Sequence, residues 1–75
     1  MLSFARDQIL FWRDTVVEMF RRGVSPEDEE VIFMELLERD PFLAAWRKME
    51  PDIRDREREF IGNSIRGFAG AYGPK

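Results

Sequence analysis

Residues 5–20 read ARDQILFWRDTVVEMF, and this stretch decides the fold class. Its apolar side chains recur at alternating spacings of four and three residues, at Ala5, Ile9, Trp12, Val16 and Met19. A period close to 3.6 residues places these side chains on one face of an α-helix. The stretch therefore predicts a long amphipathic helix, which we place over about residues 3–22.

Glycine and proline signals divide the rest of the chain. Gly23 follows two arginines, as is typical of a helix C-terminus. The segment Ser25-Pro26-Glu27-Asp28 has the capping serine, first-turn proline and early acids of a helix start. Pro41 and Pro51 repeat this signal, and Pro51 suits either a new helix or a kink in one bent rod. We predict further helices over about 26–39, 41–49 and 51–66.

The helix over 26–39 has an unusual pattern, because Val31 and Met34 fall on the back of its main apolar face. A helix that is apolar on most sides is typical of burial between neighbours. The whole chain has only 75 residues, which allows one small domain. We therefore predict an all-α bundle of three to four helices over residues 1–67. Gly70 and Gly73 then predict a flexible, glycine-rich tail over 68–75.

The composition excludes several kinds of chemistry. Neither cysteine nor histidine occurs, which rules out disulfides, zinc-finger sites and every histidine-based catalytic device. The acids of Glu27-Asp28-Glu29-Glu30 lie where a helix N-terminus attracts negative charge, so we interpret them as structural. No phosphate-binding loop or EF-hand spacing is present. We expect no enzyme activity, no metal and no cofactor.

The charge of the chain is unevenly distributed. Twelve basic and fifteen acidic residues give a net charge of −3, which disfavours nucleic acid as a partner. The acids concentrate in residues 25–40, where Arg39 is the only base. Either this segment complements the mildly basic flanks within the chain, or it docks on a basic partner.

Aromatic residues exceed what a bundle of this size readily hides, since seven Phe, two Trp and one Tyr occur in 75 residues. Phe4 and Phe11 lie two turns apart on the polar side of the first helix. Three placements fit them: beneath the tail or another helix, against a second copy of the chain, or against a different partner. Phe68 and Tyr72 either fold back over Phe4 and Phe11 or form a linear motif for a partner.

Glu57 is the polar exception on the apolar side of the last helix, between Ile53 and the Phe60-Ile61 pair. It is either an edge position or one member of an ion pair across a helix–helix or subunit contact. The candidate partner-binding residues are therefore Phe4, Phe11, Glu57, Phe68 and Tyr72.

These features predict a non-enzymatic helical regulator or accessory subunit that binds another protein. Self-association into a homodimer would cover surplus apolar surface. The alternative is a nucleic-acid-binding transcriptional regulator, in which a dimer aligns Arg47, Lys48, Arg54 and Arg58 into one basic strip. No apolar run is long enough to span a membrane, and the N-terminus lacks the pattern of a signal peptide, so we expect a cytoplasmic protein.

Overall fold

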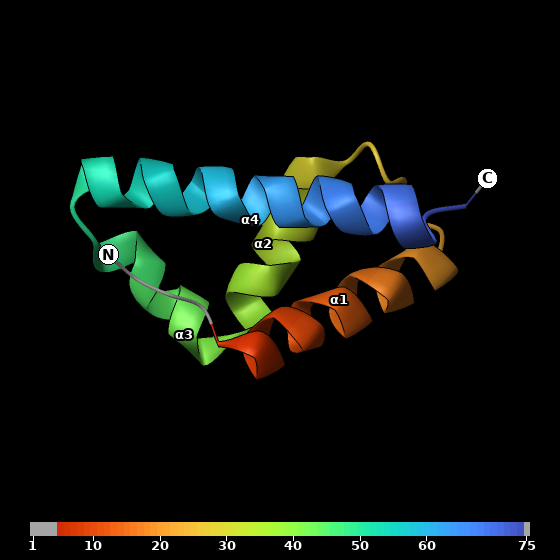
Figure 1. Cartoon of the computed structure of the whole chain (residues 1–75), viewed down its shortest axis with the longest axis horizontal. Coiled ribbons are helices and arrows are strands. Elements are labelled where there is room, and N and C mark those ends of the chain that lie inside the picture. Colours follow the sequence, from red (N-terminus) through yellow and green to blue (C-terminus); the bar gives the residue numbers. More distant parts are fainter. Residues whose placement is uncertain (1–4, 75) are drawn as a thin grey trace.

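The computed structural model describes residues 5–74 and shows a helical bundle (Figure 1). Within this range no strand occurs, which confirms the all-α fold class. The elements in chain order are α1 (Arg6–Arg21), α2 (Glu29–Arg39), α3 (Pro41–Ala44), the 3-10 helix η1 (Ala45–Lys48) and α4 (Pro51–Tyr72). The predicted third helix is therefore a short α-helix that tightens into a 3-10 turn.

Three helices form the body of the bundle, since α1, α2 and α4 each contact the other two. In Figure 1, α4 runs along the long axis, α1 is inclined below it, and α2 passes behind α4 and descends toward the start of α1. The short α3 and η1 close the end of the bundle opposite the C-terminus. Pro51 occupies the first turn of α4, so it starts a separate helix rather than kinking one rod.

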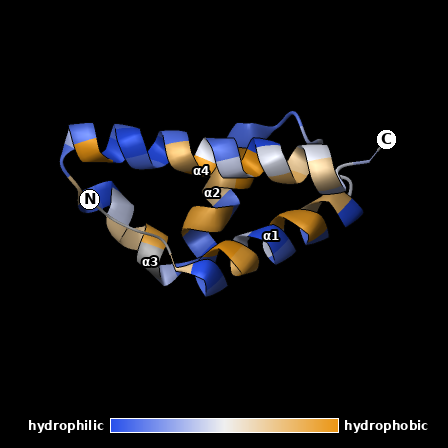
Figure 2. Ribbon diagram, viewed as in Figure 1, coloured by the Kyte–Doolittle hydropathy of each residue, from blue (hydrophilic) through white to orange (hydrophobic). Residues whose placement is uncertain are grey.

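The core is filled mainly from α1 and α2, and the predicted apolar face of α1 is the one that is buried. The buried apolar residues are Trp12, Val16, Met19, Phe20, Ile32, Phe33, Leu36, Leu37, Leu43, Ile61 and Ile65. Figure 2 shows the contrast along α4, whose N-terminal half is mostly hydrophilic. Only the middle and C-terminal parts of α4 therefore contribute apolar side chains to this core.

The end of α1 follows the sequence prediction closely. Gly23 has a φ of +96°, a left-handed conformation that costs glycine little. The backbone N–H of Gly23 donates to the Phe20 carbonyl at 3.0 Å, and that of Val24 donates to the Met19 carbonyl at 3.1 Å. These two bonds form a Schellman motif, which satisfies the last carbonyls of α1 and turns the chain toward α2.

The start of α2 differs from the prediction, because the helix begins at Glu29 and not near residue 26. The backbone N–H of Asp28 donates to the Ser25 carbonyl at 3.0 Å, which closes a turn before the helix. The Ser25 hydroxyl accepts the N–H of Glu27 at 3.3 Å within this turn. The serine, proline and acids that resemble a helix start therefore build a turn here.

The predicted flexible tail over 68–75 is wrong for most of its length, since α4 continues to Tyr72. Phe68 and Ala69 are partly buried against the core, and these contacts hold the last turns in place. Glycine in a helix costs about 1 kcal/mol relative to alanine, which one buried aromatic side chain outweighs. The helical domain therefore extends beyond residue 67, where we had expected it to end.

Candidate protein-binding surface

The structure does not bring the predicted partner-binding residues to one surface. Phe11 and Tyr72 are exposed, at 43% and 49% of their surface. Phe68 is half-buried against the core, and Glu57 is 6% exposed. Phe4 lies outside the described residues. Phe11 and Tyr72 line separate grooves.

Phe11 lies at a shallow groove of about 410 Å³ where α1 meets the junction of α2 and α3. Asp7, Gln8, Arg39 and Pro41 also line this groove. The polar side of α1 that carries Phe11 is partly covered, because Thr15 on the same stripe is buried. Phe11 is thus exposed at the edge of an interhelical seam rather than in the middle of an open face.

A buried carboxylate lies beside this groove. Asp40 accepts a hydrogen bond on Oδ2 from Trp12 Nε1 at 2.7 Å and another from Gln8 Nε2 at 2.9 Å. The sequence had indicated Asp40 only as part of a helix start before Pro41. The signal that could have found this contact is the core position of Trp12, since a buried indole N–H usually has an acceptor. The contact joins α1 to the end of α2.

The outer face of α2 carries exposed apolar side chains that sequence reasoning missed. Val31 is 54% exposed and Met34 is 40% exposed, so our expectation that α2 is enclosed on most sides is wrong. Together with Glu30, Glu35 and Glu38 they line a groove of about 310 Å³. This groove therefore combines two apolar side chains with three carboxylates from one helix.

An ion pair connects the two grooves. Arg39, which lines the Phe11 groove, donates from Nε to Oε1 of Glu35 at 2.6 Å, and Glu35 lines the α2 groove. The combined surface is called the α1–α2 face below. It comprises Phe11, Glu30, Val31, Met34, Glu35, Glu38 and Arg39.

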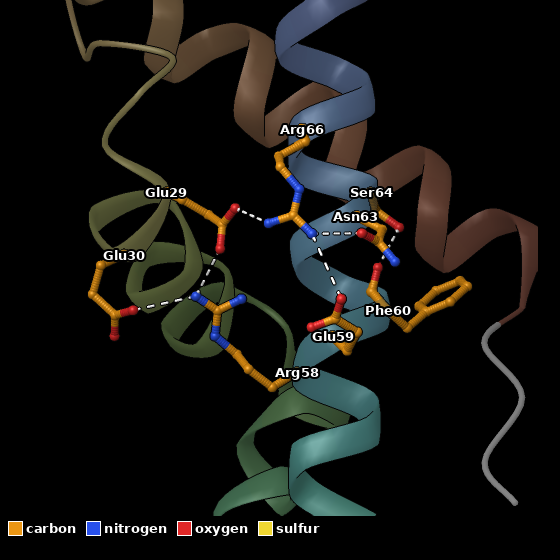
Figure 3. Close-up of polar contacts among 8 residues, drawn as sticks. All are labelled: Glu29, Glu30, Arg58, Glu59, Phe60, Asn63, Ser64 and Arg66. Carbon is orange, nitrogen blue, oxygen red and sulfur yellow. Dashed lines mark hydrogen bonds and ion pairs between the residues drawn. The ribbon is translucent and has the colours of Figure 1, made fainter.

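The N-terminus of α2 is tied to the middle of α4 by a charged cluster (Figure 3). One oxygen of Glu29 accepts from Arg58 at 3.0 Å, and the other accepts from Arg66. Arg58 also reaches Glu30 at 3.2 Å, and its guanidinium lies 4.1 Å from the centre of the Phe33 ring. Arg58 therefore joins α4 to α2 in two ways, through ion pairs with the glutamates and through the cation–π contact of its guanidinium with Phe33.

Gly62 lets the side chains of this charged cluster lie close to the backbone of α4. A Cβ at this position would lie 2.9 Å from Nη1 of Arg58 and 3.2 Å from Oε2 of Glu29. Burial opposes ionisation of Glu29, but the hydrogen bonds and charges of Arg58 and Arg66 outweigh it and hold its pKa below the ordinary value. The ionised form of Glu29 is therefore the one that fits the folded chain.

Half of the basic strip proposed for a nucleic-acid regulator is engaged within the chain. The Arg54 guanidinium lies 5.9 Å from the centre of the Trp46 ring, and the Arg54 carbonyl accepts from Trp46 Nε1 at 3.0 Å. Arg58 is held by the glutamates of α2. Of the four residues of this strip, Arg47 and Lys48 are exposed and make no such contact with other described residues. This arrangement does not favour binding to phosphates.

Glu57 is buried on α4, and within residues 5–74 it has no hydrogen bond or ion pair. Of the two alternatives for Glu57, the ion pair across a helix–helix contact is therefore not formed among residues 5–74. The edge position fits the structure, because no buried side-chain oxygen among these residues lacks a hydrogen-bond partner and the Glu57 carboxylate must then reach the surface. Glu57 is not among the residues of the α1–α2 face.

Within the part of the chain that the structure describes, no group of three or more acidic side chains is arranged to hold a metal ion. No helix there is long and apolar enough to cross a membrane. Comparison with protein-family models, with curated proteins and with solved structures found no match to this chain. Any functional conclusion therefore depends on the surface itself.

Proposed function

We propose that this chain is a non-enzymatic protein-binding module, either a regulator or an accessory subunit, and that it binds through the α1–α2 face. The observation that carries this proposal is the pair Val31 and Met34, which stay exposed although the bundle behind them has a filled core. Single exposed apolar residues are ordinary, but adjacent ones that line one groove are typical of interaction sites.

The energy available from this face is modest but useful. Full burial of a valine, methionine or phenylalanine side chain contributes about 1.5–3 kcal/mol. Because Val31, Met34 and Phe11 are each about half exposed, covering them adds about 1 kcal/mol per residue. Three such anchors with a charged rim resemble the centre and edge of a small protein interface.

Self-association, which the sequence also predicts, fits another part of the molecule better. A two-fold contact through the α1–α2 face would place Glu30, Glu35 and Glu38 against their own copies, and like charges oppose such a contact. The groove at Tyr72 is lined by Val17, Phe20, Arg21 and Pro74 and has no acid. We assign a homodimer contact, as a second proposal, to this groove.

Quantitative affinity capture from the native cell tests the main proposal. The baits are the wild type, Met34→Ser and the matched control Ile53→Ser, which truncates an apolar side chain of similar exposure on α4. We expect at least one protein to be captured by the wild type and by Ile53→Ser but lost with Met34→Ser. If Met34→Ser retains every protein that the other two baits capture, the α1–α2 face is not the binding surface.

Molar mass separates the dimer proposal from the first one. Light scattering of the purified chain is expected to show a dimer that Tyr72→Ser weakens and Met34→Ser leaves unchanged. A monomer for the wild type at high concentration would contradict self-association without affecting the proposal for the α1–α2 face.

A further inference from the structure

The chemistry of the groove on α2 narrows the kind of partner that fits it. Its residues come from one helix at positions 30, 31, 34, 35 and 38, the spacing of a single helical face. Rows of side chains at this spacing form the ridges and grooves into which a second helix packs. The groove presents side chains and not a free strand edge, so a helical partner matches it better than an extended one.

The lining of this groove is acidic, although part of its charge is neutralised. It contains three glutamates and no base. Glu30 contacts Arg58 and Glu35 contacts Arg39, so each of these two carboxylates already has its own cation. Glu38 has no ion pair among the described residues. Glu38 and the 74%-exposed side chain of Glu30 therefore remain open to a partner's cations.

From these observations we infer that the partner segment is a basic amphipathic helix of another protein. Its apolar residues, spaced three or four apart, would cover Val31 and Met34, and Lys or Arg residues on both sides would face the glutamates. This inference rests on the proposed function and specifies the partner of the same face.

Neither the α1–α2 face of a second copy nor the exposed N-terminal half of its α4 supplies such a helix. Its α1–α2 face carries the same acids, and residues 54–59 of its α4 alternate arginine with aspartate and glutamate. The first would repel the groove, and the second would bring an acid beside each base. We therefore assign the matching helix to a different protein, in which bases flank an apolar stripe.

A helical peptide library displayed on phage is the probe that tests this inference. The library keeps a leucine stripe at helical spacing and randomises the flanking positions, and it is selected on the wild-type chain. We expect enrichment of Lys and Arg at the flanks. A synthetic peptide of the selected sequence should bind about tenfold more weakly when the salt concentration rises from 0.05 to about 0.5 M, because salt screens exposed ion pairs.

Two pairs of variants then test the apolar contact and the charge contact of the peptide separately. Met34→Ser should weaken peptide binding about fivefold, corresponding to the loss of about 1 kcal/mol of apolar contact, with Ile53→Ser, which truncates an apolar side chain of similar exposure on α4, as its control. Glu38→Lys should weaken it at least tenfold, whereas Asp55→Lys, an equal change of charge on exposed α4, should not. Circular dichroism of each variant checks that the helices are intact.

The selected peptides could instead be uncharged or acidic and depend on Met34 but not on Glu38. This result would overturn the inference that the partner is a basic helix, but it would still support the α1–α2 face as a protein-binding surface. A selection in which no peptide depends on Met34 would overturn both proposals. Basic peptides that tolerate Glu38→Lys as well as Asp55→Lys would show only general attraction to an acidic chain, and this too would overturn the inference.

Discussion

Replacing Trp12 by phenylalanine tests the buried contact that joins α1 to the end of α2. Trp12 is fully buried, and its indole N–H donates at 2.7 Å to the carboxylate of Asp40. Phenylalanine keeps most of the ring but removes this donor. Gln8 Nε2 would still donate to the same oxygen at 2.9 Å, so Asp40 loses one partner rather than its whole environment.

The expected cost follows from these distances and from the burial of both groups. A hydrogen bond to a charged group contributes about 1.5–3 kcal/mol. The smaller ring also leaves a small cavity, which adds about 1 kcal/mol. Trp12→Phe should therefore lower the free energy of unfolding by about 2.5–4 kcal/mol. A domain of this length has a total stability of roughly 4–11 kcal/mol, so the variant remains folded when the wild type lies above the lower end of this range.

Urea unfolding followed by circular dichroism measures this loss, and Trp46→Phe is the matched control. Trp46 Nε1 donates at 3.0 Å to a neutral backbone carbonyl of Arg54 in a half-buried site, so its replacement should cost only about 0.5–1.5 kcal/mol. In an Asp40→Asn background the cost of Trp12→Phe should fall to about 1.5–2.5 kcal/mol, because the acceptor is then neutral and only the cavity cost of about 1 kcal/mol is unchanged. A Trp12→Phe variant as stable as Trp46→Phe would refute the importance of the bond to Asp40.

Three further changes have definite expected outcomes. Gly67→Ala should raise the free energy of unfolding by about 0.5–1 kcal/mol in thermal unfolding, since a Cβ there meets nothing within 4 Å; a loss of stability would contradict a helix at this position. Because the folded-state pKa of Glu29 is lowered, its contribution is present above about pH 4.3 and is lost as the pH falls through the lowered pKa. Glu29→Gln should therefore lose less stability than the wild type between pH 7 and pH 3 in urea titrations, and equal losses would count against the contacts with Arg58 and Arg66. Phe11→Asp should leave helicity and stability nearly unchanged but weaken binding at the α1–α2 face, and an unfolded variant would show that Phe11 belongs to the core.

The features of the fold that depend on residues close together in the sequence were predictable. The buried face of α1, the end of α1 at Gly23 and the start of α4 at Pro51 all follow from helical periodicity and from backbone conformation. The extension of α4 to Tyr72 was not predictable in this way. It depends on the burial of Phe68 against a core that the other helices build, and this contact overrides the low helix propensity of Gly67 and Gly70.

The candidate surface was harder to predict, because exposure depends on how the helices cross. The helical wheel correctly separated Phe11 from the buried face of α1. The same reasoning failed for Val31 and Met34, since an apolar side chain on the back of a helix is buried only if a neighbour covers it. Here α1 and α4 both pack on the opposite side of α2, around Ile32 and Phe33, and leave its back uncovered.

The polar contacts of the fold have a consequence for binding at the α1–α2 face. The N-terminus of α2 is held to α4 through Glu29, Arg58 and Arg66, and its C-terminal end is held to α1 through Asp40 and Trp12. A helix fixed at both ends loses little conformational freedom when a partner covers its outer face. The few apolar contacts that this face offers can therefore contribute almost fully to affinity, and loosening either end should weaken binding without any change to the surface itself.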